Sequence, residues 1–363
     1  MLPNEARTQR RDPRLRVLLN GQTLTGAYEA DVSSNNHWSA DCFRVAIALG
    51  PDDWADAKFW SSEANMIIDV QLSLDGGESF SSAIQGTVDT VEIEPIAGDV
   101  RIRGRDFTSA LIEAPTQETF ANRTASEIAT MLAYRHSLVP SVIPTTTPVG
   151  RFYQSDHESI TLNSLSRVTT EWDLLVFLAQ QENCDVYVGG NSLYFQPMVD
   201  PSAISCVLQP SDLIEIRLER SLMLAQEIQV AVKSWNTQQR AAFVEQVSGT
   251  VTGTTSGSSP LTGPARQYVL ICPNLTPDRA SAVAMQRLNE LIRHERTIDL
   301  SMPGELVLAP RNVVLLSGTG TDFDQAYYVE SLDRKFSIRT GFVQQVRANN
   351  TSPRTISTLT SVS

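Results

Sequence analysis

The stretch from Glu171 to Pro197 reads EWDLLVFLAQQENCDVYVGGNSLYFQP, and it decides the fold. Its first half repeats apolar residues at helical spacing. These residues are Trp172, Leu175, Val176 and Ala179, with Leu174 and Leu178 widening the stripe. Its second half alternates apolar and polar residues on both sides of Gly189-Gly190-Asn191, a sequence typical of a tight turn. We therefore predict a helix that begins near Thr170 and ends near Asn183, followed at once by a β-hairpin that Pro197 closes.

A second helix is predicted upstream of this stretch. Thr124 and Glu127 have the spacing of a capping box, in which each side chain bonds the backbone amide of the other. The apolar residues Ile128, Met131, Leu132 and Tyr134 follow on one face. Together with the later helix and hairpin, this predicts a compact α+β domain over residues 111–205.

The chain on both sides of this domain carries strand patterns. Apolar residues alternate with other residues from Phe43 to Leu49 and from Ile68 to Leu74, and Asp75-Gly76-Gly77 marks a turn. We assign residues 16–110 to a first β-domain and residues 206–347 to a second one. The second also contains a helix starting at Pro277 and a Gly/Ser/Thr-rich loop at 248–264, which we expect to be flexible.

The two β-domains share an internal echo. The segment DVQLSLDGGESFSSAIQGTVDTVEIEPIAGDVRIRGRD begins at Asp69, and NVVLLSGTGTDFDQAYYVESLDRKFSIRTGFVQQVRAN begins at Asn312. Each has an alternating strand, a glycine-containing turn, an aromatic residue (Phe80 or Phe323) and two further strands. One interpretation is a duplicated core that gives two similar β-barrels in one chain. The other is convergence of two ordinary antiparallel meanders. If the duplication is real, three chains present six similar modules.

Composition limits the classes of function. The formal net charge of −12 disfavours binding of nucleic acid through its phosphates. No apolar run approaches the roughly 18 residues that span a bilayer, so no membrane segment is expected. The first 15 residues form a basic arm without the apolar core of a secretion signal, and residues 348–363 form a Ser/Thr-rich tail that we expect to be poorly ordered. The chain is expected to be made and folded in a cytoplasm.

No pattern of catalytic or metal-binding residues stands out, so we predict no catalytic, cofactor-binding or metal-ligating residues. The histidines 37, 136, 157 and 294 form no metal motif, and His157 in Asp156-His157-Glu158-Ser159 is interpreted as part of a polar loop. Gly318-Thr319-Gly320 is interpreted as a hairpin turn and not as a phosphate loop. The carboxylate pairs Asp52-Asp53 and Glu92/Glu94 are interpreted as solvated turn and strand residues. Isolated buried thiols are expected for Cys42, Cys184, Cys206 and Cys272, and core or interface positions for Trp54, Trp60, Trp172 and Trp235.

Three segments in this order resemble a known family. They are AxTQETFxNRTASEIA (residues 114–129), the helix and hairpin of residues 171–197, and PGELVLAPRNVVLLSGTGTDFDQAYYVESLDRKFS (residues 303–337). The chain is similar over about residues 16–347 to the late-control D family of phage baseplate hub proteins, and to the N-terminal hub part of VgrG. The resemblance implies a mainly β fold in which two Tudor-like barrels flank the α+β domain.

The resemblance also implies a function. It suggests a homotrimer, without enzymatic activity, that forms a pseudo-six-fold ring in the baseplate of a virion tail. One face of the ring would meet the tail tube or a distal tail protein, and the other a separate central spike protein. The tape measure protein and baseplate wedge proteins are further implied partners, and DNA would pass through the channel without specific binding. Two alternatives stay open: a peptidoglycan-degrading tail enzyme, and a type VI secretion or tailocin hub.

Overall fold

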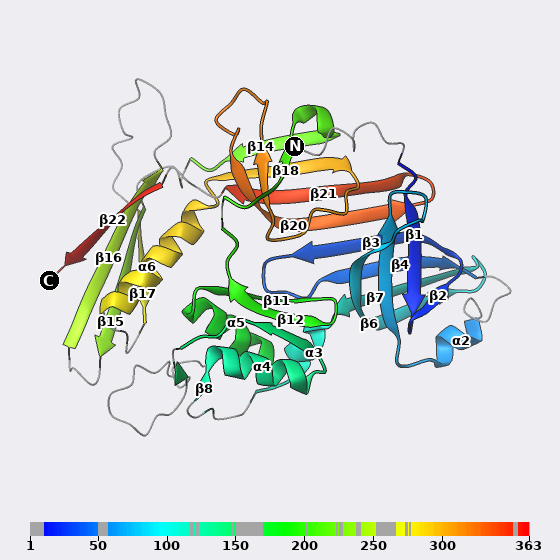
Figure 1. Cartoon of the computed structure of the whole chain (residues 1–363), viewed down its shortest axis with the longest axis horizontal. Coiled ribbons are helices and arrows are strands. Elements are labelled where there is room, and N and C mark those ends of the chain that lie inside the picture. Colours follow the sequence, from blue (N-terminus) through cyan, green and yellow to red (C-terminus); the bar gives the residue numbers. More distant parts are fainter. Residues whose placement is uncertain are drawn as a thin grey trace.

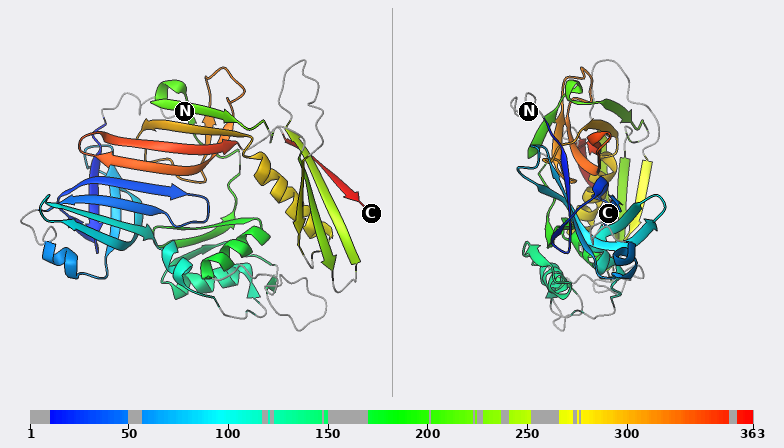
Figure 2. Two further views of the ribbon diagram at one scale, coloured as in Figure 1. Left: turned by 180° about the vertical axis from the view of Figure 1, so that it is seen from behind. Right: turned by 90° about the vertical axis from the view of Figure 1, so that its right-hand side faces the viewer.

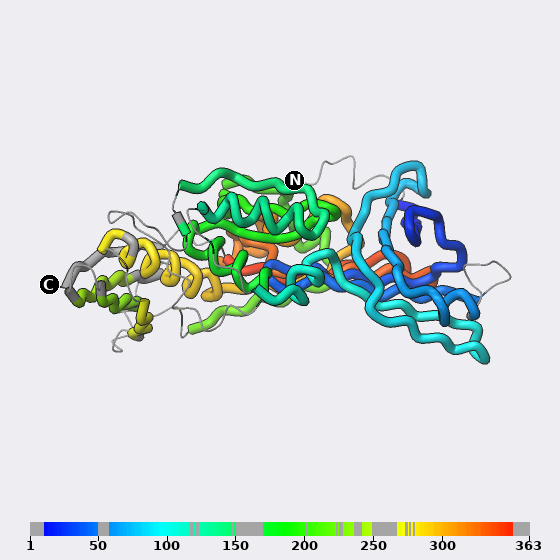
Figure 3. Tube along the Cα trace, turned by 90° about the horizontal axis from the view of Figure 1, so that it is seen from below, coloured from blue at the N-terminus to red at the C-terminus, as the bar shows by residue number. Residues whose placement is uncertain are grey.

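The computed structural model describes residues 11–49, 57–116, 120, 123–146, 148–149, 170–200, 202–222, 224, 228–236, 241–251, 266–272, 275, 277–350 and 355–362. Within these ranges the chain is mainly β. The molecule is elongated, with a β-module at one end, a second β-module and an α+β unit in the middle, and a helix on a separate sheet at the other end (Figures 1 and 3). No described helix has the length and apolarity needed to cross a membrane.

The first module is an antiparallel arrangement of six strands, and the short strand β2 (Gln22–Leu24) pairs with β1 at its outer end. Its strands lie in the spatial order β3-β4-β7-β6-β5-β1. The predicted alternation puts the side chains of Val45, Ile68 and Ile102 in one core. The strands are β1 (Arg14–Leu19), β3 (Ala27–Asn35), β4 (Cys42–Ala48), β5 (Ile67–Ser73), β6 (Ser81–Glu94) and β7 (Asp99–Asp106), and the short helix α2 (Ala57–Ser62) lies between β4 and β5.

The α+β unit follows the first module and confirms the predicted helices and hairpin. The capping box at Thr124 is present, and Thr170 forms a second one with Asp173 that the sequence reading missed. Both helices bury their apolar faces in one core with the hairpin, which β9 extends by pairing with β12. The elements are α3 (Thr108–Glu113), β8 (Arg123–Thr124), α4 (Ala125–Arg135), β9 (Val139–Val142), β10 (Pro148–Val149), α5 (Glu171–Gln181), β11 (Cys184–Gly189) and β12 (Ser192–Pro197).

The second module repeats the strand order of the first. Its six strands lie in the order β14-β18-β21-β20-β19-β13, and their order along the chain matches as well. One difference is that β13 pairs with β19 in parallel, whereas β1 pairs with β5 antiparallel. The elements are β13 (Ile204–Leu208), η3 (Pro210–Asp212), β14 (Glu215–Arg220), β18 (Arg296–Pro303), β19 (Val313–Leu316), β20 (Ala326–Ser337) and β21 (Gly341–Asn350).

The internal echo corresponds to the meander β5-β6-β7 in one module and β19-β20-β21 in the other. The middle strand of each has a register shift, at Asp89 in β6 and at Glu330 in β20. When the two register shifts are superimposed, Ile102 of β7 corresponds to Val346 of β21. Ile102 lies opposite Val45 and Val91 on its two neighbouring strands, and Val346 lies opposite Leu300 and Leu332 on the equivalent strands. The echo therefore identifies the right strands, although the gapless alignment is offset by a few residues from the structural one.

The two modules are joined edge to edge. Strand β3 pairs antiparallel with residues 331–337 of β20, so both modules belong to one 13-stranded sheet. The described pairings follow an open path with a side branch, in which β19 pairs with β20 and β13 pairs with β19, and none of them closes a barrel. The prediction of two Tudor-like barrels thus stays a prediction, while the mainly β class is confirmed.

A separate unit is inserted between β14 and β18, where the prediction had a single domain over residues 206–347. Helix α6 (Pro277–Ile292), predicted from Pro277, packs its apolar face on a sheet of the order β17-β15-β16-β22 (Figures 1 and 2). Part of the predicted loop at 248–264 is strand, and residues 252–264 lie outside the described residues. Within the predicted tail, residues 355–362 form strand β22, which pairs with β16. The strands are β15 (Ile228–Asn236), β16 (Ala241–Val251), β17 (Arg266–Ile271) and β22 (Thr355–Val362).

The joint between the modules gives a stability prediction. Leu332 is fully buried where β20 crosses from the core of the second module to its pairing with β3. Leu332→Ala should lower the free energy of unfolding by about 2–5 kcal/mol, because it leaves a cavity in a packed core. Ile338→Ala in the same hairpin is the control, since Ile338 is 71% exposed. Equal effects of the two changes in urea unfolding would contradict the burial at this joint.

Candidate functional site: the junction of three units

Arg311 lies where the two modules and the α+β unit meet, in the loop between β18 and β19. Its own backbone amide donates to the Val329 carbonyl at 2.9 Å within the second module. Its guanidinium donates to the Asn35 carbonyl of the first module at 3.2 Å and forms an ion pair with Asp185 of the α+β unit. The guanidinium carbon also lies 4.3 Å from the centre of the Tyr187 ring. One side chain therefore connects all three units.

The backbone of Arg311 supports this role. Its φ angle is +75°, a region that costs a residue with a side chain about 1–3 kcal/mol. Strain of this kind persists only where surrounding contacts fix the conformation. The four contacts of Arg311 supply that constraint.

A tryptophan contact fixes the helix α5 to the same junction. The Trp172 indole donates to the Trp38 carbonyl at 2.6 Å, and Trp38 adopts a φ of +56° in the loop between β3 and β4. Trp172 is buried at the N-terminus of α5, where the capping box of Thr170 and Asp173 positions it. The first module and the α+β unit are thus held together by a buried aromatic side chain that also makes a polar contact.

Two carboxylates, the buried Asp106 and the half-buried Asp41, face a small cavity beneath these contacts. Asp41, Asp106, Trp38, Trp172 and Arg311 are among its lining residues, and it has room for about one water molecule. Burial, together with the nearby Asp41 carboxylate, raises the pKa of Asp106 to about 7. Burial also raises the pKa of Asp41. A raised carboxyl pKa is a common property of catalytic acids, but a cavity of this size excludes a sugar or peptide substrate.

The carboxylates are held by local hydrogen bonds. Asp106 accepts from the amide of Thr108 at 3.2 Å and from its hydroxyl at 2.9 Å. Asp41 accepts from the amide of Asn35 at 2.9 Å. Nearby, burial lowers the pKa of Arg334 to about 10, while Asp41 acts in the opposite direction. These groups fix the loop after β3 and the end of β7.

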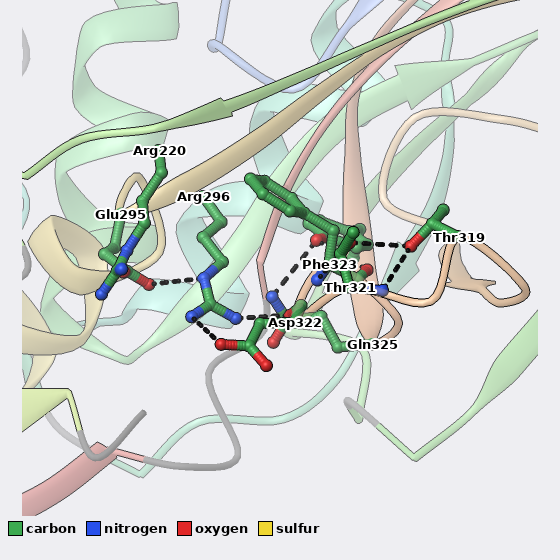
Figure 4. A network of polar contacts seen from close by, with 9 residues as sticks. Arg220, Glu295, Arg296, Thr319, Thr321, Asp322, Phe323 and Gln325 are labelled. Atoms are coloured by element: carbon green, nitrogen blue, oxygen red, sulfur yellow. Dashed lines mark hydrogen bonds and ion pairs between the residues drawn. The ribbon is translucent and has the colours of Figure 1, made fainter. Parts of the chain in front are cut away.

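A second polar network joins the α6 unit to the second module (Figure 4). Glu295 is fully buried, and Arg220 donates to it at 2.8 Å. Arg296 lies 3.4 Å from the other Glu295 oxygen, and its guanidinium also lies 3.8 Å from Asp322 and 5.7 Å from the Phe323 ring. The Glu295–Arg296 pair lacks hydrogen-bond alignment, so Arg220 supplies the better contact. The network fixes the chain where the inserted unit returns to β18.

The histidines in the described part of the chain do not converge on one site. His136 follows α4, and its Nε2 lies 2.6 Å from the buried Glu171, which links α4 to α5. His37 lies 3.5 Å from Glu330, and His294 follows the end of α6 as predicted. His157, with the rest of Asp156–Ser159, lies outside the described residues. Within the described part of the chain no group of three His, Cys, Asp or Glu residues could hold a metal.

The cysteines and carboxylate pairs have separate positions. Cys184 and Cys206 are buried as predicted, but Cys42 at the start of β4 is exposed and Cys272, directly after β17, is half-buried. Glu92 and Glu94 pair with Arg103 at 3.4 Å and Arg101 at 3.6 Å on the outer face of the β6–β7 hairpin. Asp52 and Asp53 lie outside the described residues.

Two of the tryptophans and the glycine turn take the predicted positions. Trp60 and Trp172 are core residues, as predicted, and Trp235 is 51% exposed. Trp54 lies outside the described residues. Gly318–Gly320 forms the expected turn between β19 and β20. The sequence did not point to Arg311, Asp41, Asp106 or Glu295, because their partners lie in segments distant along the chain.

Comparison with solved structures shows the fold. The chain is similar to a tail protein from Neisseria meningitidis MC58, with a TM-score of 0.68 at 13% identity over 93% of this chain and 96% of that one. It is also similar to the 43 kDa tail protein of prophage MuSo2 from Shewanella oneidensis, with a TM-score of 0.65 at 14% identity over 94% and 99% of the two chains.

A third similar structure comes from a secretion system. The Escherichia coli c3393 protein, described as a type VI secretion component similar to the T4 tail proteins gp27 and gp5, has a TM-score of 0.53 at 10% identity over 93% of this chain and 77% of that one. No protein-family model and no curated protein sequence matches the chain. The expectation of a tail-protein fold is thus confirmed from structure alone.

The Arg311 contacts predict that substitution of this residue lowers the local stability of the junction. Arg311→Ala should leave the half-buried Asp185 without its ion-pair partner and cost on the order of 1–3 kcal/mol. Hydrogen exchange should accelerate in α5 and β11, and less in the β3–β4 hairpin. Arg339→Ala, at an exposed position of the next hairpin, should leave exchange unchanged. Unchanged protection of α5 in the Arg311 variant would contradict the role of Arg311 as the connection.

The pKa of Asp106 predicts a pH dependence of stability. Because folding raises this pKa from the ordinary value of about 4 to about 7, the fold is favoured while Asp106 is protonated and loses that contribution as the pH rises through this range. Asp106→Asn should abolish this part of the decline, on the order of 1–4 kcal/mol, in urea unfolding between about pH 4.5 and about pH 8. The second module has an asparagine, Asn350, at the position that corresponds to Asp106. Glu215→Gln, an exposed change, should retain the native pH profile.

Proposed function

We propose that this chain is a structural hub protein of a phage tail or a related injection particle, and that it works as a homotrimer. The observation that carries the proposal is the repeated module: six strands in the same spatial order occur twice in one chain. The similarity to tail proteins supports it. The duplication gives a single chain two copies of one interaction surface.

The repeat explains how a trimer could meet a six-fold partner. Three chains with two modules each present six similar modules around one axis, so a hexameric tube can dock without a mismatch of symmetry. In this arrangement one face of the ring contacts the tail tube or a distal tail protein, and the other holds a central spike protein. The tape measure protein and baseplate wedge proteins are further partners in the virion tail, after assembly in the bacterial host cytoplasm.

The charge of the chain fits a channel that passes DNA without binding it. The net charge of −12 disfavours neutralisation of phosphates, and an acidic lining repels the DNA backbone. A ring of this kind requires rigid joints between its units. The contacts of Arg311, Trp172 and Glu295 supply such joints.

The rival class is a peptidoglycan-degrading enzyme. Such an enzyme needs two carboxylates on either side of a substrate cleft. The buried pair Asp41 and Asp106 faces a cavity with room for about one water molecule, and Glu92 and Glu94 are paired with arginines on an open surface. Neither arrangement favours hydrolysis.

The mass of the purified protein in solution tests the proposal. A complex of three times the chain mass of 39.9 kDa is expected by native mass spectrometry or sedimentation, in solution or after addition of purified tail tubes. Purified protein should not clear a peptidoglycan suspension. A chain that stays monomeric with tail tubes present, or muralytic activity that disappears in Glu92→Gln, would contradict the hub function.

A further inference from the structure

Strand β14 has an open edge that its counterpart in the first module does not have. β14 corresponds to β3, because the two strands have the same place in their modules. β3 pairs with β4, which pairs with β7, and β14 pairs with β18, which pairs with β21. The outer edge of β3 is covered by β20. The outer edge of β14 has no partner among the described strands.

Strand β6 has a matching open edge. It corresponds to β20, and both strands have a register shift near their middle. Before the shift, β6 pairs with β5 and β20 pairs with β19. After the shift, β20 pairs with β3, whereas residues 90–94 of β6 have a partner only on the β7 side among the described strands.

The structure therefore contains one filled joint and two halves of an unfilled one. We infer that β14 of one copy pairs antiparallel with residues 90–94 of β6 in the next copy, and so repeats the β3–β20 joint between chains. This inference rests on the proposed trimer and deepens it by naming the surface that closes the ring. β14 ends the sheet on one side, and the β6–β7 hairpin projects at the end of the molecule away from α6 (Figures 1 and 3).

The pairings inside each module fix the register. Val32 lies opposite Phe43, and Leu218 lies opposite Ile298, in strands that occupy the same place. Leu218 is therefore the counterpart of Val32. Val91 pairs with Ile102, and Leu332 pairs with the corresponding residue Val346, so Val91 is the counterpart of Leu332. Two residues further along each strand, Ile93 is the counterpart of Arg334. Because Val32 lies opposite Arg334, Leu218 lies opposite Ile93 of the next copy.

The side chains on the core side favour this contact. Leu218 and Ile216 are half-buried against the core of the second module, and Ile93 and Val91 are half-buried against the core of the first. In this register Leu218 meets Ile93 directly, while Val91 lies opposite Arg220 and Ile216 lies opposite Pro95. Pairing therefore buries the contact between Leu218 and Ile93 most fully. Ile214, which is 63% exposed, lies on the same face of the chain as Ile216 and continues the row.

The charged side chains on the other side distinguish the two joints. Within one chain, Asp31 lies opposite Lys335. In the joint between chains the corresponding residues are Arg217 and Glu94, so the signs are exchanged but remain complementary. A mispaired joint would place Arg217 opposite Lys335, or Asp31 opposite Glu94, and like charges in direct opposition destabilise a strand pair.

One like-charge contact remains in the proposed register. Glu219 lies opposite Glu92, and Arg103 lies 3.4 Å from Glu92 on the neighbouring strand. Arg101 lies opposite Glu92 in β7 as well. These arginines offset the repulsion.

Closure of the ring also removes a hazard. A long unpaired strand edge invites uncontrolled pairing with other chains. A head-to-tail contact closes into a ring when its rotation fits, and otherwise extends as a filament. The joint between chains copies the joint within a chain, so the same rotation relates each of the six modules to the next. The open edges of β14 and of residues 90–94 in β6 are then both paired.

A cysteine cross-link tests the register. Leu218→Cys and Ile93→Cys are combined in a Cys42→Ser background, since Cys42 is exposed. Opposite residues of antiparallel strands lie about 4.5–5.5 Å apart at Cα, within the range of a disulfide. Mild oxidation should give covalent dimers and trimers on a non-reducing gel. Leu218→Cys combined with the exposed Ile338→Cys is the control, and it should give none.

A charge exchange supplies a second test that leaves the cores intact. Arg217→Glu or Glu94→Arg alone should weaken trimer formation roughly three- to ten-fold in sedimentation, and the double variant should recover it. Trimers that form without the 93–218 cross-link and ignore both single changes would overturn the strand pairing and leave the hub function standing. Monomers that neither cross-link nor bind tail tubes would overturn both proposals.

Discussion

The pairing of β3 with β20 is the interaction on which the rest of the structure depends. It turns two modules, each built of six strands, into one sheet. In this register Asp31 lies opposite Lys335, and the Ser33 hydroxyl donates to Asp333 at 2.5 Å. A slip of one residue would reverse the face of every side chain in β3 and expose Val32 to solvent.

The bulge near Glu330 makes this pairing possible. β20 is long enough to serve two partners, first β19 within its own module and then β3 of the other. The extra residue redirects the strand between them. Glu330 is buried at this point and lies 3.3 Å from Arg347 and 3.5 Å from His37, so the kink carries a compensated charge. The same kink in β6, at Asp89, prepares that strand for a partner that a single copy of the chain does not supply.

Several charged groups lie at the joints between units. Asp106 and Glu295 are buried there, and Arg311 and Asp41 are half-buried. Charged groups at such positions add less stability than apolar packing of equal volume, but their directional contacts fix one geometry.

The sequence by itself determined the local structure. Apolar periodicity, the capping box at Thr124 and the turn at Gly189–Asn191 depend on residues close in the chain, so the helices, the hairpin and most strands could be predicted, and the echo identified the repeated meander. Only the tertiary structure decided which strands from distant segments pair. The β3–β20 joint, the insertion of the α6 unit between β14 and β18, and the Arg311 junction depend on residues up to about 300 positions apart. No local propensity specifies such contacts, because their energy arises only when both partners are already folded.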